Sequence, residues 1–340
     1  MNVQRRWYSA AGLAAALLMT LTAWCIPSHA QSPKPAATAA KEKVVVRFTW
    51  KLKGEYAPLF VALDKGYFAA EGLDVELAEG QGAQTVLRLI AAGTENIGYG
   101  PATAAAQAVS QGMPVTVAAL YQTKAPMGVI AFPDVPLKTP KDLEGKRIGV
   151  SVGETFTDML DPFARLNKLD LAKITRIQMD NSARTGQFLN RKVDVMSVYL
   201  SNELPLLEQR TGVKFNILRV ADYGLNLLGA SYYVGNDFAA KNPDTVTRLL
   251  RATARGYADA MKDPKAAAEI MNKHMKIKEN PDVLLAQVKA TVDSTNAPAG
   301  RPIGWQREED WKTCLDLLMS TGAIKERKAP SAYFTNQFMK

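Results

Sequence analysis

Polar and aromatic side chains gather at the ends of several apolar runs that are typical of β-strands. Aromatic rings stack on flat ligands, and carboxylates accept hydrogen bonds from ring or exocyclic N–H groups. Because parallel sheets present ligand contacts at the carboxyl ends of their strands, these residues are candidates for one binding site. Before residue 130 they are Trp50, Gln81, Gly82, Gly100, Thr103 and Tyr121, and after it Glu154, Thr155, Tyr199, Asn202 and Glu203.

Several of these positions also have a purely structural explanation. Trp50 is compatible with a core tryptophan at a strand end, and Gly100 with the start of a helix. Glu203 at a helix start would compensate the helix dipole without touching a ligand. Gln81 lies between two glycines, which let the backbone approach a ligand closely and so favour a functional role.

The chain has few of the residues that covalent or metal catalysis needs. Of its two histidines and two cysteines, only His274 and Cys314 lie downstream of Ala30. One histidine and one cysteine far apart cannot form a usual zinc site or a Cys/His nucleophilic pair. The sequence also lacks a Gly-x-Ser-x-Gly elbow, a phosphate-binding loop and a dinucleotide fingerprint. We therefore expect no catalytic residues, no metal and no cofactor, in a protein that is not an enzyme.

The elements that position the candidate residues alternate between strand and helix. Such alternation is typical of βαβ units, whose right-handed crossovers give doubly wound, mostly parallel sheets. In the first part of the chain strands are expected at 44–50, 73–78, 97–99, 115–120 and 127–132. After two prolines the pattern restarts, with strands expected at 147–152, 174–179, 193–198 and 215–220.

The order of these elements predicts two α/β lobes with a cleft between them. The run 227–234 is expected to return to the first sheet, and helical stretches follow at 243–261, 264–275, 281–291 and 306–321. Lobe I, with the C-terminal helices, is therefore assigned to 44–132 and 226–340, and lobe II to 133–225. The crossings, near Ala131–Pro136 and near Ala221–Leu225, are expected to form a hinge.

The first 30 residues have the three parts of a secretory signal peptide. Arg5 and Arg6 precede the apolar run Ala10–Leu21, and Ser28-His29-Ala30 provides small residues for cleavage after Ala30. An uncleaved membrane anchor is the alternative, although the run is short for a bilayer span and rich in alanine. Residues 31–43 follow as a flexible leader without periodicity.

The charge of the chain gives little sign of a nucleic-acid partner. The formal net charge is +9, but the basic residues are scattered and not interleaved with aromatic residues in a patch. We expect no binding to nucleic acid.

Three segments carry a family resemblance: residues 55–75, residues 137–150, and Val193-Asp194 followed by Tyr199, Asn202 and Glu203. They resemble the NMT1/THI5-like family, which includes binding proteins for nitrate, taurine, alkanesulfonates, thiamine pyrimidines and riboflavin. The resemblance implies a type II periplasmic-binding-protein fold that holds a solute in the cleft, with Tyr56 among its lining residues. It also implies a monomer in the periplasm whose partners are the permease and ATPase of an inner-membrane ABC importer.

The candidate residues favour one ligand class within that family. Aromatic rings with carboxylate and amide groups suit a small nitrogen heterocycle, similar to a thiamine pyrimidine or riboflavin, whereas an anion site would want arginine or several free donors. Taurine, an alkanesulfonate or nitrate is the alternative. A remote alternative is an enzyme similar to the family's pyrimidine synthases, but this chain lacks their cysteine-rich motif. A ligand-sensing subunit also stays open.

Overall fold

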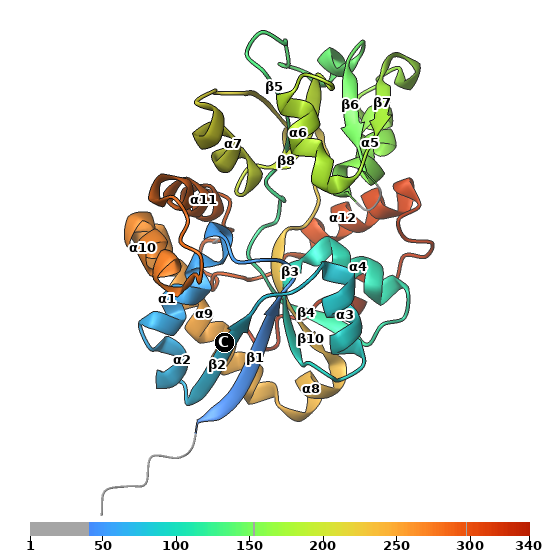
Figure 1. Cartoon of the computed structure of the whole chain (residues 1–340). Coiled ribbons are helices and arrows are strands. Elements are labelled where there is room, and N and C mark those ends of the chain that lie inside the picture. Colours follow the sequence, from blue (N-terminus) through green and yellow to red (C-terminus); the bar gives the residue numbers. More distant parts are fainter. Residues whose placement is uncertain (1–40, 152–153, 297) are drawn as a thin grey trace, which may run out of the picture. The chain divides into compact units, whose positions relative to one another are not determined.

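Two five-stranded sheets organise the computed structural model, which describes residues 41–151, 154–296 and 298–340 (Figure 1). The first has the strand order β2 (Leu73–Ala78), β1 (Glu42–Phe48), β3 (Ile97–Pro101), β10 (Ala230–Gly235) and β4 (Val115–Leu120). The second has the order β7 (Thr175–Gln178), β6 (Arg147–Val150), β8 (Val195–Tyr199), β5 (Met127–Ala131) and β9 (Asn216–Arg219).

In each sheet four strands run in one direction and the fourth strand of the order runs against both neighbours. The two reversed strands are β10 and β5. The predicted α/β class with two mostly parallel sheets is therefore confirmed. The predicted signal peptide, its cleavage site after Ala30 and residues 31–40 of the predicted leader lie outside the described residues.

The predicted place of the fifth strand is wrong. Met127–Phe132 was expected in the first sheet, yet β5 pairs with β8 and β9 in the second. The chain therefore leaves the first sheet through residues 121–126, earlier than the expected crossing near Ala131–Pro136. The return strand β10 lies in the first sheet as predicted, between β3 and β4. Periodicity places a strand in the sequence but carries no information about which sheet it joins.

Helices follow the strands as the alternation predicts. Those of the first part are α1 (Ala57–Asp64), α2 (Tyr67–Ala70), α3 (Ala83–Ala91) and α4 (Ala102–Ser110), and those between strands of the second sheet are α5 (Thr155–Leu166), α6 (Arg184–Leu189) and α7 (Glu203–Thr211). After β10 come α8 (Asn236–Lys241), α9 (Pro243–Lys262), α10 (Pro264–His274), α11 (Pro281–Asp293) and α12 (Glu308–Thr321). No helix in the described ranges is long and apolar enough to cross a membrane.

The C-terminal helices only partly follow the prediction that they cover lobe I. Helices α9 and α10 pack against α1, as expected. Helix α11, however, also contacts α7, and α12 contacts α5. The last two helices therefore touch elements that belong to both sheets.

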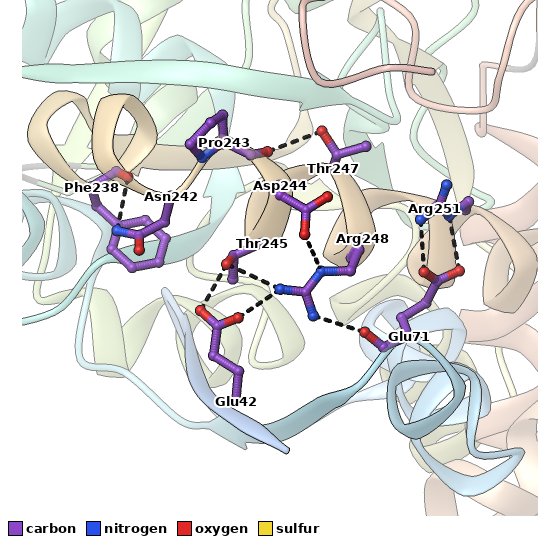
Figure 2. A network of polar contacts seen from close by, with 10 residues as sticks. All are labelled: Glu42, Glu71, Phe238, Asn242, Pro243, Asp244, Thr245, Thr247, Arg248 and Arg251. Carbon is purple, nitrogen blue, oxygen red and sulfur yellow. Dashed lines mark hydrogen bonds and ion pairs between the residues drawn. The ribbon is translucent and has the colours of Figure 1, made fainter. Parts of the chain in front are cut away.

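A polar network fixes α9 to the first residue of β1 and to the segment between α2 and β2. Arg248 Nη2 donates to Glu42 Oε2 at 2.6 Å, and its Nη1 donates to the carbonyl oxygen of Glu71 at 2.8 Å. Thr245 Oγ1 donates to the other oxygen of Glu42, and Arg251 forms a two-pronged pair with the Glu71 carboxylate (Figure 2). Since α9 packs against α1, this network also fixes the helix that follows the pocket residue Tyr56.

A cluster of buried aromatic side chains packs near the ends of strands β1, β3 and β4 of the first sheet. Tyr56 stacks on Phe48 with ring centroids 4.1 Å apart, and Tyr121 stacks on Tyr257 at 4.3 Å. Tyr99 joins these pairs edge-on at 6.0 Å from Tyr56. Such packing makes the strand ends around the cluster rigid, because close-packed rings leave little room for rearrangement.

Candidate functional site

A cavity of about 310 Å³ opens where the two sheets present their strand ends. This volume lies at the lower end of the range of small-molecule sites, about 300 to 1,000 Å³. Residues predicted from both halves of the sequence meet in its lining, namely Trp50, Tyr56, Gly82, Gly100, Glu154, Thr155, Tyr199, Asn202 and Glu203. The structure thus brings together residues up to half the chain apart.

Three of the predicted residues are not among those that line the cavity. Tyr121 is fully buried in the aromatic cluster, because its backbone N–H bonds to the carbonyl of Ala230 and turns the side chain into the core. Thr103 Oγ1 donates to the carbonyl of Leu228 at 2.9 Å. Gln81 is exposed, although its neighbour Gly82 lines the cavity.

The lining also contains residues that the sequence analysis did not place there, among them Thr49, Lys53, Glu55, Gln122, Arg184, Ser197, Ser201 and Thr291. Lys53 and Glu55 had a detectable signal, since they lie between the predicted residues Trp50 and Tyr56. Arg184 begins the helix after β7, at a position where a ligand contact could have been expected. Thr291 lies inside α11, and nothing in its local sequence indicates a binding site.

The floor of the cavity depends on glycine. A Cβ atom on Gly100 would lie 2.3 Å from Thr49 Cγ2 and 2.8 Å from Thr49 Oγ1, so no larger residue fits there without moving Thr49. Gly82 has a φ of +108°, which side-chain-bearing residues rarely adopt. Both glycines bring the backbone close to the space that a ligand would occupy.

Trp50 is the most exposed aromatic residue of the lining. Its exposed fraction is 52%, because β1 ends at Phe48 and Trp50 lies in the following loop, not at the strand end that was expected. An indole in a cavity lining offers its face for stacking, and a ligand that stacks on it buries the surface that is exposed in the free chain. The position therefore suits recognition of a flat ring.

Glu203, the first residue of α7, contributes a carboxylate to the lining of the cavity. Its Oε2 accepts the backbone N–H of Tyr199 at 2.8 Å, and Asn202 Nδ2 donates to its Oε1 at 3.3 Å. Burial raises the pKa of the Glu203 carboxyl, and the nearby Lys53 ammonium partly opposes that effect. A ligand N–H group that bonded to this carboxylate would relieve part of its desolvation.

Two tyrosines supply hydroxyl groups that burial keeps neutral. Burial raises the pKa of Tyr199 to about 12 and raises the pKa of Tyr56 well above its ordinary value. The Tyr56 hydroxyl makes no hydrogen bond of good geometry within the described part of the chain, although Glu55 and Thr49 lie near enough to influence its pKa. A buried hydroxyl of this kind is costly unless a ligand or water completes it.

The two cations of the lining each lie beside a carboxylate. Lys53 Nζ is 3.5 Å from Glu55 Oε1, and Arg184 Nη2 is 4.0 Å from Glu154 Oε1. Glu154 also caps α5 by accepting the backbone N–H groups of Phe156 and Thr157. With Glu203, the lining carries three carboxylates and two cations, an arrangement that disfavours a strongly anionic ligand.

The histidine and the cysteine of the described residues lie outside the cavity lining. Within the described residues, no group of three or more histidine, cysteine, aspartate or glutamate side chains is placed to hold a metal ion. The cavity lining contains neither Cys314, which is fully buried, nor His274, which contacts Asp64 at the end of α10. The arrangement can stack a ring and exchange hydrogen bonds with it.

Comparison with known sequences gives matches along most of the chain. The family model described as "NMT1/THI5 like" matches residues 53–267. A riboflavin-binding protein, RibY of Chloroflexus aurantiacus, is 27% identical over 91% of this chain and 89% of its own length. A formylaminopyrimidine-binding protein of Halalkalibacterium halodurans is 22% identical over 82% of this chain and 85% of its own.

Enzymes also occur among the similar sequences. A 4-amino-5-hydroxymethyl-2-methylpyrimidine phosphate synthase of Legionella pneumophila is 23% identical over 69% of this chain and 75% of its own length. The match is shorter than those with the two binding proteins.

Comparison with solved structures identifies the fold. The periplasmic aliphatic sulphonate binding protein SsuA of Escherichia coli superposes with a TM-score of 0.67 and 15% identity, over 86% of this chain and 91% of its own. The predicted two-lobed periplasmic-binding fold is thereby confirmed. At this identity the similarity concerns the fold alone.

Proposed function

Because the chain belongs to the NMT1/THI5-like family, we propose that it is the solute-binding component of an ABC importer and that its solute is a small nitrogen heterocycle. The observation that carries this proposal is the cavity whose lining contains both the half-exposed Trp50 indole and the half-buried Glu203 carboxylate. An aromatic face and an acceptor are what a planar ring with N–H groups requires.

The mode of binding follows from the geometry of the lining. The ring stacks on Trp50 as the two sheets approach, and an N–H group of the ring or its substituent donates to Glu203. The Tyr56 hydroxyl, which makes no hydrogen bond of good geometry in the described chain, bonds to a polar group of the ligand. The two binding proteins with similar sequences, for riboflavin and for formylaminopyrimidine, support a ligand of this class.

The charges of the lining argue against the alternative ligands. Taurine, alkanesulfonates and nitrate carry an anionic group that needs free cationic or N–H donors. Lys53 lies beside Glu55, Arg184 lies beside Glu154, and Glu203 adds a further negative charge when ionised. A neutral heterocycle avoids the repulsion that an anion would meet.

The proposal also covers the setting in which the protein works. We infer export through a signal peptide cleaved after Ala30, action as a monomer in the periplasm, and delivery of the solute to an inner-membrane permease with its ATPase. We infer a binding protein and not an enzyme, because the two longer sequence matches reported above are with binding proteins. A synthase-like activity is the remote alternative, which the sequence match with the Legionella synthase supports.

A thermal-shift panel tests the ligand class. The chain, refolded to remove carried-over solute, is melted with riboflavin, formylaminopyrimidine, taurine, alkanesulfonates and nitrate. A ligand at about 100 times its dissociation constant stabilises the fold by about 2.7 kcal/mol, several degrees in melting temperature. We expect a shift with riboflavin or the pyrimidine. A shift with sulfonates or nitrate alone would replace the heterocycle by the anion and keep the transport role.

A further inference from the structure

Gln287 on α11 joins two segments of the cavity that belong to different sheets. The backbone N–H of Gly54, which follows β1, donates to Gln287 Oε1 at 2.9 Å. Gln287 Nε2 donates to the carbonyl of Asn202, which follows β8, at 3.0 Å. The side chain is buried, with only 3% of the residue exposed. Residue 287 lies beyond the range 53–267 that the family model matches.

Both segments held by Gln287 carry cavity residues. Gly54 lies between Lys53 and Glu55, and Asn202 directly precedes Glu203. A single buried amide therefore spans from the loop that bears the Lys53 ammonium to the helix start that bears the Glu203 carboxylate. Because an amide has both a donor and an acceptor, it can satisfy an N–H on one side and a carbonyl on the other.

The packing around this amide is close. A Cβ atom on Gly54 would lie 2.6 Å from Gln287 Cβ and 3.0 Å from the carbonyl oxygen of Leu284. Glycine at position 54 is thus what lets α11 approach the loop. The same helix also contributes Thr291 to the cavity lining, and Ser294 just after it accepts a hydrogen bond from Gln122 Nε2 at 2.8 Å.

We propose that Gln287 is a positioning residue that latches the two halves of the cavity together and thereby slows release of the solute. The proposal rests on the proposed binding function for its effect on a ligand, but the latch itself concerns the two protein segments. When the halves separate, the Gly54 N–H and the Asn202 carbonyl lose their shared partner. The latch therefore favours the arrangement in which Lys53 and Glu203 face the same space.

The test measures the distance between the halves without a ligand. Spin labels are placed at Ala69 on α2 and Gln187 on α6, both exposed. Cys25 is replaced by serine in the full chain. Cys314, which is buried, is then the one native cysteine left beside the two labelled positions. Distances are measured by pulsed electron paramagnetic resonance in the parent chain and in Gln287→Leu, which removes the donor and the acceptor at similar size.

Gln306→Leu serves as the matched control. Gln306 is an equally buried glutamine whose amide bonds to the carbonyls of Val117 and Thr335 and to Trp311 Nε1, away from the cavity. Its loss lowers the melting temperature, as the loss of any buried hydrogen-bonded amide does, without touching the latch. A general loss of stability is thus separated from an opening of the cavity.

We expect longer and broader distances in Gln287→Leu, and distances equal to those of the parent in Gln306→Leu. Riboflavin, used as the probe, should dissociate about tenfold faster from Gln287→Leu, with little change in its association rate constant. Unchanged distances in Gln287→Leu would overturn the latch. If riboflavin binds neither chain, the heterocycle proposal fails for this probe, while the distances still decide about the latch.

A conservative variant covers the case in which Gln287→Leu does not fold. In Gln287→Glu the carboxylate still accepts the Gly54 N–H. At neutral pH, however, the ionised carboxylate has no donor for the Asn202 carbonyl, and the two oxygen atoms repel each other. Protonation of the new carboxyl group restores a donor. We expect distances that shorten toward those of the parent as the pH is lowered, by more than any change in the parent, in which Glu203 beside Asn202 also titrates with a raised pKa. Distances in Gln287→Glu that equal those of the parent at every pH would contradict the latch.

Discussion

At the scale of single residues, recognition depends on groups that the fold leaves incomplete. Most aromatic side chains near the cavity are fully buried, as Tyr99 is, whose hydroxyl bonds to that of Tyr257. Trp50 is half exposed, and the Tyr56 hydroxyl is buried without a hydrogen-bond partner in the part of the chain described. A ligand that covers the first and bonds to the second removes both deficits.

Trp50→Ala should weaken binding of the heterocycle without weakening the fold. Loss of a stacking face and of its buried area costs about 1.5 to 3 kcal/mol of binding, roughly 10- to 150-fold in the dissociation constant. The melting temperature of the free chain should stay near that of the parent, since the indole is exposed there. Ile277→Ala trims another exposed apolar residue, outside the cavity, and is expected to change neither quantity. Equal affinity in Trp50→Ala and the parent would remove Trp50 from the site.

The raised pKa of Glu203 gives the free chain a characteristic pH dependence. Burial favours the protonated carboxyl in the folded state, so the folded chain binds more protons than the unfolded one above the ordinary glutamate pKa of about 4.3. This group therefore lowers the free energy of unfolding as the pH rises through that region. Glu203→Gln removes the effect and should melt higher than the parent at neutral pH, by a margin that vanishes at acidic pH. Glu269→Gln, at an exposed carboxylate, should give no such margin. A constant or opposite difference would contradict the burial account of Glu203.

The sequence predicted site residues where a local pattern carries the information. Gly100 and Glu203 follow strands whose ends are visible as apolar runs, and both line the cavity. Tyr121 also follows a strand, yet its side chain turns into the core, because the backbone direction after β4 depends on pairing with β10. Thr291 reaches the cavity through the packing of α11, which local sequence does not encode.

At the scale of elements, the turn from β3 to α4 builds the cavity floor. Gly100 pairs with Ser231 of β10, and Ser231 Oγ donates to the carbonyl of Gly100 at 2.8 Å. The strand therefore holds the glycine directly against Thr49, with no room for a side chain. A short, fixed turn of this kind keeps the ligand contacts in register with the sheet.

Gly100→Ala should damage both the fold and the site. The new methyl group would lie 2.3 Å from Thr49 Cγ2, so Thr49, which lines the cavity, must move, at a cost of about 1 to 3 kcal/mol in stability. Binding of the heterocycle should weaken in the same variant. Gly186→Ala is the matched control, because its Cβ meets nothing within 4 Å in helix α6, and should stabilise the fold by up to about 1 kcal/mol. Chemical denaturation measures the stability and a binding titration the affinity. If both are unchanged in Gly100→Ala, the cavity floor accommodates a methyl group and the prediction is wrong.

At the scale of the whole molecule, the second sheet interrupts the first in the sequence. The chain leaves the first sheet after β4 and returns with β10, which runs antiparallel between β3 and β4. The alternation of strands and helices was enough to predict two α/β sheets and the return strand. It could not assign β5 to the second sheet, since strand pairing depends on contacts between distant segments. The hinge and the second lobe boundary stay predictions, whereas the pairing of β5 places the first crossing before Met127.

Calorimetric titration of the parent chain and of Glu203→Gln with formylaminopyrimidine and riboflavin decides whether the cavity binds a nitrogen heterocycle through Glu203. We expect saturable binding of at least one of them at one site per chain. We also expect a 10- to 100-fold weaker affinity, about 1.4 to 2.7 kcal/mol, in Glu203→Gln, because a charge-assisted hydrogen bond becomes a neutral one. Glu269→Gln should bind as the parent does. Binding of taurine or an alkanesulfonate in place of both heterocycles, or equal heterocycle affinity in Glu203→Gln and the parent, would contradict the account.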